Sequence, residues 1–158
     1  MYVRNCFVGV DPGKSGAYAI IFPDRVVVIP WDDYRFVDDM DYIANHPYNP
    51  IVCVESVHAM PKQGVTSTFT FGKNAGFIEG VLTAYKLPYE LVPPKSWKKM
   101  FSLTGEKQDS IDVCKRLFPD VPLRKTEKCR TDDDGMAEAL LMAEYAKRAL
   151  SGAPASQT

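Results

Sequence analysis

The pattern of apolar and polar positions predicts that the chain begins with strands. Alternating and β-branched residues indicate strands over residues 6–10, 16–22 and 25–30, and only Pro23-Asp24 separates the last two. Connections this short join antiparallel strands. We therefore expect an antiparallel meander of three strands.

Helical and strand patterns alternate over the rest of the chain. A weakly amphipathic helix is expected over residues 36–45, and Pro47 and Pro50 break it. Residues 51–55 are nearly all apolar, which is typical of a strand buried on both faces in a parallel position. Further elements are expected as helices over residues 66–85, 96–101, 108–117 and 134–150, and as a short strand over residues 89–92. This order predicts an α/β fold in three layers, with a mixed five-stranded sheet flanked by helices.

The composition predicts one domain. A chain of 158 residues can bury a full core, and we assign residues 1–150 to that domain and the small, polar residues 151–158 to a disordered tail. The chain has no apolar run of a membrane span's length and no signal-peptide pattern, so we expect a cytoplasmic protein without a membrane partner, in the host cytoplasm if it is phage-encoded. The four cysteines are scattered, which favours buried free thiols over disulfides or a zinc site.

The charges are unevenly distributed although the net charge is only −1. Residues 1–60 carry four Lys/Arg against eight Asp/Glu, whereas residues 95–130 carry ten against five. The second region is either a solvated face or a surface that contacts phosphates.

Two apolar strands end on carboxylates, Asp11 in "VGVDPGKSGAYAI" and Glu55 in "VCVESV". If these strands are neighbours, their ends lie several ångströms apart, because adjacent strands are about 4.8 Å apart. Like charges at that separation repel, so either one carboxyl group is protonated or a hard divalent cation such as Mg²⁺ neutralises the pair.

A third group of acids precedes the last predicted helix. The three aspartates 132–134 come directly before an alanine- and leucine-rich segment, and Glu138 shares a helical face with Asp134. Acids at this position also cap a helix and interact favourably with its dipole. If they meet the two strand-end carboxylates, the set suits a site for two Mg²⁺ ions and phosphodiester hydrolysis.

Four segments together resemble the RuvC-like Holliday-junction resolvases of the ribonuclease H superfamily, in their compact bacteriophage and bacterial form. These segments are "VGVDPGKSGAYAI", "VCVESV" with the helix after it, "GEKQDSIDVCKRLFP" and "DDDGMAEALLMAEYA", and the resemblance extends over residues 6–148. It implies a ribonuclease H-like fold and a crossover junction endodeoxyribonuclease. Such an enzyme cuts four-way DNA junctions by paired symmetric nicks, with two Mg²⁺ ions per site that Mn²⁺ can replace.

The resemblance also implies roles for particular residues. Asp11 and Glu55 match metal ligands, and the last pair of family acids falls on Asp134 and Glu138, which we expect to complete the catalytic and metal-binding set. The spacing departs from the family, because the acids lie four rather than three residues apart and Gly135 stands three before Glu138; Asp133 is the substitute ligand. Lys107 falls where the family carries a lysine close to the scissile phosphate.

The expected DNA-binding surface includes the basic region and the loop after Glu55. Some family members place a junction-inserting aromatic residue three positions after this glutamate, where this chain has His58. The expected DNA contacts are His58, Lys62, Lys95, Lys98, Lys99, Lys107, Arg124, Lys125, Lys128 and Arg130. Trp97 is interpreted as a core anchor, and Phe69 and Phe71 could face either the core or the DNA.

Glycines at positions 72, 76 and 80 give the helix over residues 66–85 a smooth stripe. The stripe allows close packing either on the chain's own sheet or on another helix. In the resembled family this helix contributes to a twofold interface, which implies a homodimer that can cut two strands symmetrically.

Three other interpretations remain. The Asp-Pro-Gly turn is also similar to the phosphate loop of actin and sugar-kinase folds, but those proteins need two such domains, so we expect no nucleotide cofactor. A general nuclease for flaps and Y-forks would use the same site. A non-catalytic junction-binding protein would have little reason to hold carboxylates at adjacent strand ends, where they repel phosphates.

Overall fold

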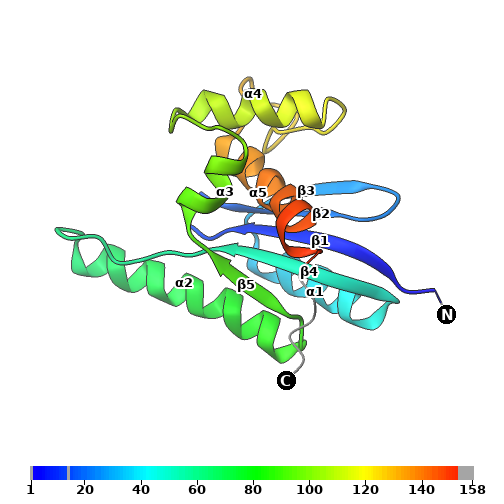
Figure 1. The fold of residues 1–158 in the computed structure, drawn as a ribbon. Helices are drawn as coiled ribbons and strands as arrows, with labels where there is room; N and C mark the ends of the chain where they lie inside the picture. Colours follow the sequence, from blue (N-terminus) through cyan, green and yellow to red (C-terminus); the bar gives the residue numbers. More distant parts are fainter. Residues whose placement is uncertain (1, 14, 153–158) are drawn as a thin grey trace.

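Within the described part of the chain, five strands form one mixed sheet (Figure 1). The computed structural model describes residues 2–13 and 15–152. The strands are β1 (Arg4–Asp11), β2 (Ala17–Ile21), β3 (Val26–Pro30), β4 (Tyr48–Glu55) and β5 (Tyr89–Val92), in the order β3-β2-β1-β4-β5. The first three are antiparallel, and β4 is parallel to β1 and β5. The predicted meander and the parallel position of the fourth strand are confirmed.

Helices cover both faces of this sheet, as the sequence predicts. They are α1 (Asp33–Asn45), α2 (Val65–Ala84), α3 (Pro94–Met100), α4 (Lys107–Leu117) and α5 (Asp134–Tyr145), and a π-helical segment (Ala146–Leu150) follows α5. Helices α1 and α2 lie below the sheet in Figure 1, whereas α5 lies above it with α3 and α4 near its first turns. The result is a three-layer α/β fold.

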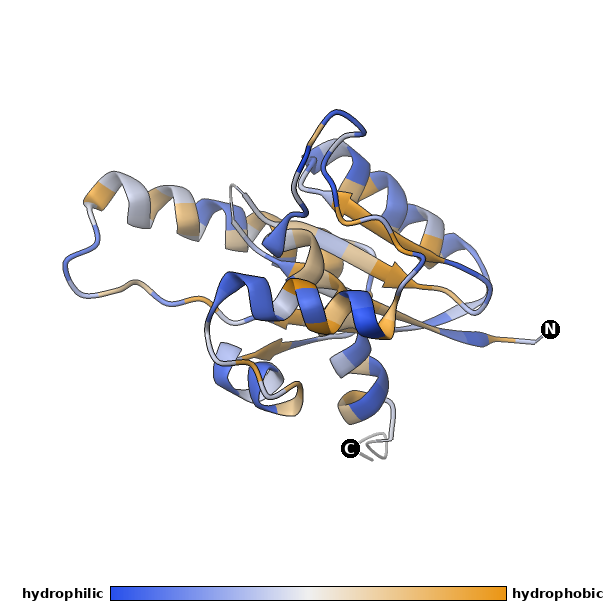
Figure 2. Ribbon diagram, turned by 90° about the horizontal axis from the view of Figure 1, so that it is seen from above, coloured by the Kyte–Doolittle hydropathy of each residue, from blue (hydrophilic) through white to orange (hydrophobic). Residues whose placement is uncertain are grey.

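The sheet separates two apolar cores. Side chains at even positions of β1, such as Val8 and Val10, pack with α1 and α2, whereas Phe7 packs with α5. A Cβ atom at Gly9 would overlap the backbone of Ala139 and Ala143, so the glycine permits α5 to lie directly on β1. Figure 2 shows the resulting concentration of hydrophobic residues in the strands. Odd positions of β1, including Asp11, therefore face α5.

Several boundaries differ from the sequence prediction. Strand β4 begins at Tyr48 rather than at residue 51, and Pro50 lies within it. A proline is tolerated there because β5 pairs only from Val52 onward and leaves that edge of β4 open. Helix α1 begins at Asp33, because the side chain of Asp32 caps it by accepting the Arg35 amide hydrogen. The final helix keeps α-helical geometry only as far as Tyr145.

The remaining expectations concern the cysteines and the chain ends. Cys6, Cys53 and Cys114 are buried free thiols, and Cys129 is a half-buried one. Of the expected tail, Ser151 and Gly152 form a turn, and residues 153–158 lie outside the described residues. Among the helices described, none is long and apolar enough to cross a bilayer.

Candidate active site

Asp11 and Glu55 are brought together by the pairing of β1 with β4. Val10 lies opposite Val54 in the parallel ladder, so the next residue on each strand is one of the two carboxylates. Both carboxylates occupy odd-numbered positions of their strands, and the side chains at these positions face α5. Trp97, fully buried on α3, donates its indole N–H to Glu55 Oε2 at 2.8 Å and fixes this carboxylate at the strand end.

The first turn of α5 lies against Asp11. A Cβ atom built on Gly135 would come within 2.8 Å of the Ser15 carbonyl oxygen and 3.5 Å of Asp11 Oδ2. Any side chain at position 135 would therefore collide with the turn after β1. This contact gives a physical reason for the departure seen in the sequence, where a glycine stands at the position expected for an acid.

The two aspartates at the start of α5 have different surroundings. Asp133 caps the helix, because its Oδ1 accepts the Met136 amide hydrogen at 2.9 Å, and its Oδ2 lies 3.3 Å from Lys125 Nζ. Asp134 acts electrostatically on Asp11, and its Oδ2 lies 3.8 Å from Lys107 Nζ. Asp133 thus serves as the helix cap, whereas Asp134 acts on Asp11, and the choice of Asp134 over Asp133 as a ligand stays a prediction.

Burial and mutual repulsion make this a site of concentrated negative charge. Burial, followed in order of importance by the charges of Glu55, Glu138 and Asp134, raises the pKa of Asp11 to about 8. Burial also raises the pKa values of Glu55 and Glu138. The Lys98 ammonium group, 3.9 Å from Glu138 Oε1, opposes all three shifts.

The donor chemistry of this cluster fits a hard divalent cation. All four side chains offer carboxylate oxygens, the ligands that Mg²⁺ prefers, and a cation would relieve the repulsion that raises the pKa of Asp11. Within residues 2–13 and 15–152, however, no three His, Cys, Asp or Glu side chains form a ready metal-binding group. The carboxylates would have to turn closer together to coordinate an ion.

Comparisons with known proteins give a match in structure only. No protein-family model and no curated protein sequence matches the chain. The structure of Thermus thermophilus RuvC with a Holliday junction substrate aligns with a TM-score of 0.59 and 13% identity, covering 90% of this chain and 94% of that one. A second Thermus thermophilus RuvC structure aligns with a TM-score of 0.57 and 14% identity, covering 90% of this chain and 95% of that one.

The fold is RuvC-like. The ribonuclease H-like architecture that the sequence predicts, with its mixed five-stranded sheet, is confirmed at the level of the fold. In this RuvC-like fold the acidic cluster lies at the carboxyl ends of β1 and β4, the edge at which open α/β sheets bind their ligands.

The expected DNA-binding residues fall into three groups around this RuvC-like site. Lys107, at the start of α4, is exposed and lies 3.8 Å from Asp134 Oδ2. His58 and Lys62 in the loop after β4, and Lys95 and Lys99 on α3, are also exposed. Arg124 and Lys125 pair with Asp132 and Asp133, while Lys128 and Arg130 are exposed in the same loop. Lys98 lies inside the carboxylate cluster.

Sequence reasoning missed two contacts of this site. It interpreted Trp97 as a core anchor, which its burial confirms, but did not foresee the hydrogen bond to Glu55. It grouped Lys98 with the DNA contacts, which stays a prediction, but did not foresee that its ammonium group lies 3.9 Å from Glu138 Oε1. The signal available was the spacing of "PPKSWKK": a proline at the first turn starts a short helix, on which consecutive residues point in different directions.

Proposed function

We propose that this protein is a Mg²⁺-dependent endonuclease that resolves four-way DNA junctions by paired symmetric nicks. The observation that carries the proposal is the convergence of Asp11, Glu55, Asp134 and Glu138 at one sheet edge, where their charges act on Asp11. The likeness of the fold to RuvC, which has been seen with a Holliday junction substrate, supports branched DNA as the partner.

The four carboxylates are the residues that would hold the metal. With two ions bound, Mg²⁺ would supply activation of the attacking water and charge stabilisation at the leaving oxygen. In the hydrolysis itself, the water oxygen forms a bond to phosphorus and the bond from phosphorus to the leaving sugar oxygen breaks. The attacking water releases one proton to solvent, and the leaving sugar oxygen takes one up to become a hydroxyl group.

Neighbouring residues prepare the site for an anionic substrate. Lys107, whose side chain is 83% exposed, is the cation available to a phosphate that approaches Asp134. Trp97 is a positioning residue, because its indole N–H holds one oxygen of the Glu55 carboxylate, Oε2, and so restricts the rotation of this group. The exposed lysines of α3 and of the loop before α5 bind the DNA backbone, from which most of the affinity comes.

We propose a homodimer that contacts through the outward face of α2. Gly72, Gly76 and Gly80 have open space at the Cβ position, and the exposed fractions of Val65 and Phe69 are 87% and 71%. In Figure 2 this end of α2 projects at the left and carries hydrophobic colour. Two sites related by a twofold axis would cut two strands of equal polarity.

The decisive experiment is cleavage of a synthetic four-way junction by the purified protein, with and without Mg²⁺, alongside Asp11→Asn. We expect paired nicks that a ligase can seal, no cleavage in EDTA, and unimpaired binding but no cleavage by the variant. Asp38→Asn, which changes an exposed carboxylate on α1, is the matched control and should cut normally.

A panel of linear, flap and Y-shaped DNAs determines substrate specificity. Equal cutting of flaps and forks would replace the junction resolvase with a general branched-DNA nuclease. Tight binding without cutting under any metal condition would contradict the catalytic role of the carboxylates.

A further inference from the structure

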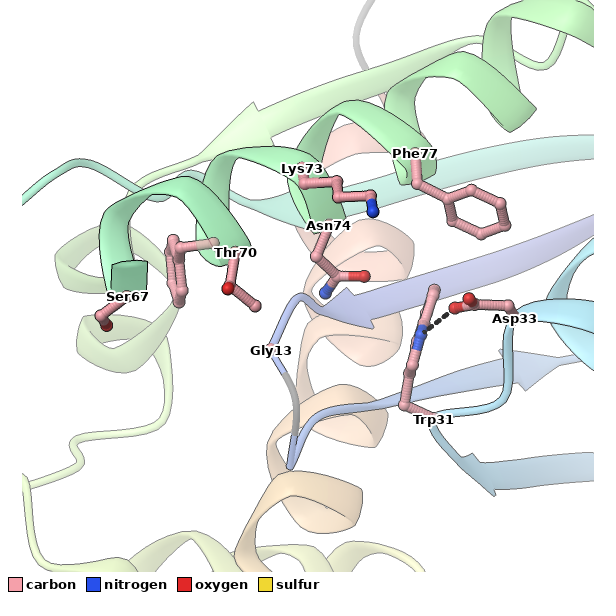
Figure 3. Close-up of a pocket in the computed structure, with 9 residues that line it drawn as sticks. Gly13, Trp31, Asp33, Ser67, Thr70, Lys73, Asn74 and Phe77 are labelled. Carbon is pink, nitrogen blue, oxygen red and sulfur yellow. Dashed lines mark hydrogen bonds between the residues drawn. The ribbon is translucent and has the colours of Figure 1, made fainter. Parts of the chain in front are cut away.

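A cavity of about 570 Å³ lies beneath the first half of α2, on the face of the sheet opposite the carboxylate cluster (Figure 3). Its walls come from α2, from the turn after β1 and from the segment that joins β3 to α1. This volume lies within the range of small-molecule sites, roughly 300–1,000 Å³. The cavity is therefore large enough for a ligand rather than a single water molecule.

Three aromatic side chains line the cavity. Trp31 stands on one side, and the centroid of the Phe77 ring lies 6.5 Å from that of Trp31. Phe71 lines the cavity from a position nearer the start of α2. The Trp31 ring is held in place because its indole N–H donates to Asp33 Oδ1 at 2.7 Å. Rigid aromatic faces are the surfaces on which nucleobases stack.

Polar groups in the cavity match a base more closely than an apolar ligand. The Asn74 amide nitrogen is shielded from solvent and has no hydrogen-bond partner among residues 2–13 and 15–152, although it lies above Gly13 in Figure 3. A buried donor without an acceptor costs free energy. A half-turn of the amide would direct it into the cavity, where a ring nitrogen or carbonyl oxygen of a base supplies the acceptor.

The charged groups of the cavity fit the same ligand. Asp33 can accept from an exocyclic amino group, and the Lys73 ammonium group can meet the attached phosphate.

The cavity is close to the proposed cleavage site along the chain. Gly13, at its mouth, follows Asp11 by two residues, so their Cα atoms are at most about 7.6 Å apart. Successive nucleotides of a stacked strand are spaced by about 3.4 Å. Because the cavity and the carboxylates lie on opposite faces of the sheet, a strand cut at Asp11 reaches the cavity by passing around the turn after β1.

We propose that this cavity binds one unpaired nucleobase of the branched DNA, close to the phosphodiester that is cut. The inference rests on the proposed function, because it takes its ligand from the same substrate. It assigns to Trp31, Phe71 and Phe77 the stacking of the base, and to Asn74 its hydrogen bonding.

Photochemical crosslinking tests the location of the base. Four-way junctions carrying 5-iodouracil at successive positions around the crossover are bound to Asp11→Asn, irradiated, digested and analysed by mass spectrometry. We expect one or two adjacent positions to crosslink to peptides that contain Trp31, Phe71 or Phe77. Crosslinks confined to other parts of the protein would overturn the proposal.

Affinity measurements test the same idea without photochemistry. Asn74→Leu should weaken binding to the junction about tenfold, leave binding to a fully paired duplex unchanged, and leave the melting temperature equal or higher, because it removes an unpartnered donor. Thr70→Trp, which fills the cavity from an exposed position, should have the same effect on binding. Asn45→Leu, at the exposed end of α1, is the matched control.

Three outcomes distinguish failure of this inference from failure of the proposed function. If both cavity variants dissociate a dimer and weaken junction and duplex binding equally, the cavity is a contact between protein chains and the inference is wrong. If the wild-type protein cuts junctions normally but neither variant changes its affinity, the inference fails alone. If the wild-type protein does not bind branched DNA, the proposed function fails as well.

Discussion

The Asp11 carboxylate lowers the stability of the metal-free protein. Its pKa of about 8 in the folded chain lies above the ordinary value of 3.8, so the unfolded chain releases this proton at lower pH. The contribution of Asp11 to stability therefore decreases as the pH rises from about 4 to about 8. The repulsion between these carboxylates, which a bound cation would relieve, thus weakens the metal-free fold around them.

Asp11→Asn should consequently raise the melting temperature in EDTA by about 3–6 °C at pH 8, a shift that corresponds to one to two kcal/mol in a domain of this size. The increase should shrink as the pH falls below the ordinary pKa of 3.8, where the carboxyl group becomes protonated in both the folded and the unfolded chain. Differential scanning calorimetry at several pH values measures this. Asp38→Asn should show no such trend, and a lower melting temperature for Asp11→Asn at pH 8 would contradict the interpretation.

Trp97→Phe tests the contact that orients Glu55. The variant keeps an aromatic ring in the core but loses the donor, so we expect cleavage to fall about tenfold and the Mg²⁺ concentration for half-maximal activity to rise. Titration of junction cleavage with Mg²⁺ measures both effects.

Tyr18→Phe is the matched control for this variant. It removes a comparable hydrogen bond, from the Tyr18 hydroxyl to Asp39 Oδ2 at 2.6 Å, in the core on the other face of the sheet. It should lower stability without changing the Mg²⁺ dependence. An equal change in Mg²⁺ dependence would mean that Trp97 acts through stability alone.

Site residues at the ends of strands are easier to predict from the sequence than the side chains that contact them. Asp11 and Glu55 are predictable because each ends an apolar strand and parallel neighbours end at the same edge. Lys98 and Trp97 are not, because their directions depend on how a seven-residue helix packs between β5 and α5. A short amphipathic pattern does not fix that orientation.

At the scale of elements, the backbones of β1 and α5 lie in direct contact at Gly9. Gly9→Ala would place a methyl group so that it overlaps the backbone of Ala139 and Ala143. Neither β1 nor α5 can move away from the methyl group without displacing the layer to which it belongs. We expect a loss of more than about 3 kcal/mol in the free energy of unfolding, measured by urea denaturation.

Gly80→Ala supplies the contrasting glycine substitution. It lies inside α2 with open space at the Cβ position, so it should increase the free energy of unfolding by about 0.5–1 kcal/mol. Equal destabilisation by the two changes would show that the loss in Gly9→Ala does not arise from the approach of α5.

Element order was predictable, whereas several ends were not. Apolar residues recur with different periods in strands and in helices, and this difference is enough to identify all five strands and the helices on both faces of the sheet. The start of β4 depends on which of its edges β5 leaves unpaired, and that is a property of the assembled sheet rather than of residues 48–50.

At the scale of the whole molecule, the proposed dimer makes a kinetic prediction. Gly76→Arg places a long charged side chain on the open face of α2, so the protein should change from dimer to monomer in light scattering. The monomer should nick single strands of the junction without coupling the two cuts. Tyr34→Arg, on the exposed surface of α1, should leave both properties intact, and a wild-type monomer that makes paired cuts would contradict the prediction.

The carboxylates of the site come from distant parts of the chain. Asp11 belongs to β1 and Glu55 to β4, but Asp134 and Glu138 are carried by α5, which also supplies much of the core on that face of the sheet. During synthesis on the ribosome, the first two acids emerge long before the last two. A nascent chain is therefore expected to lack the proposed cutting activity until α5 has docked on the sheet, so that activity would appear together with the core on this face.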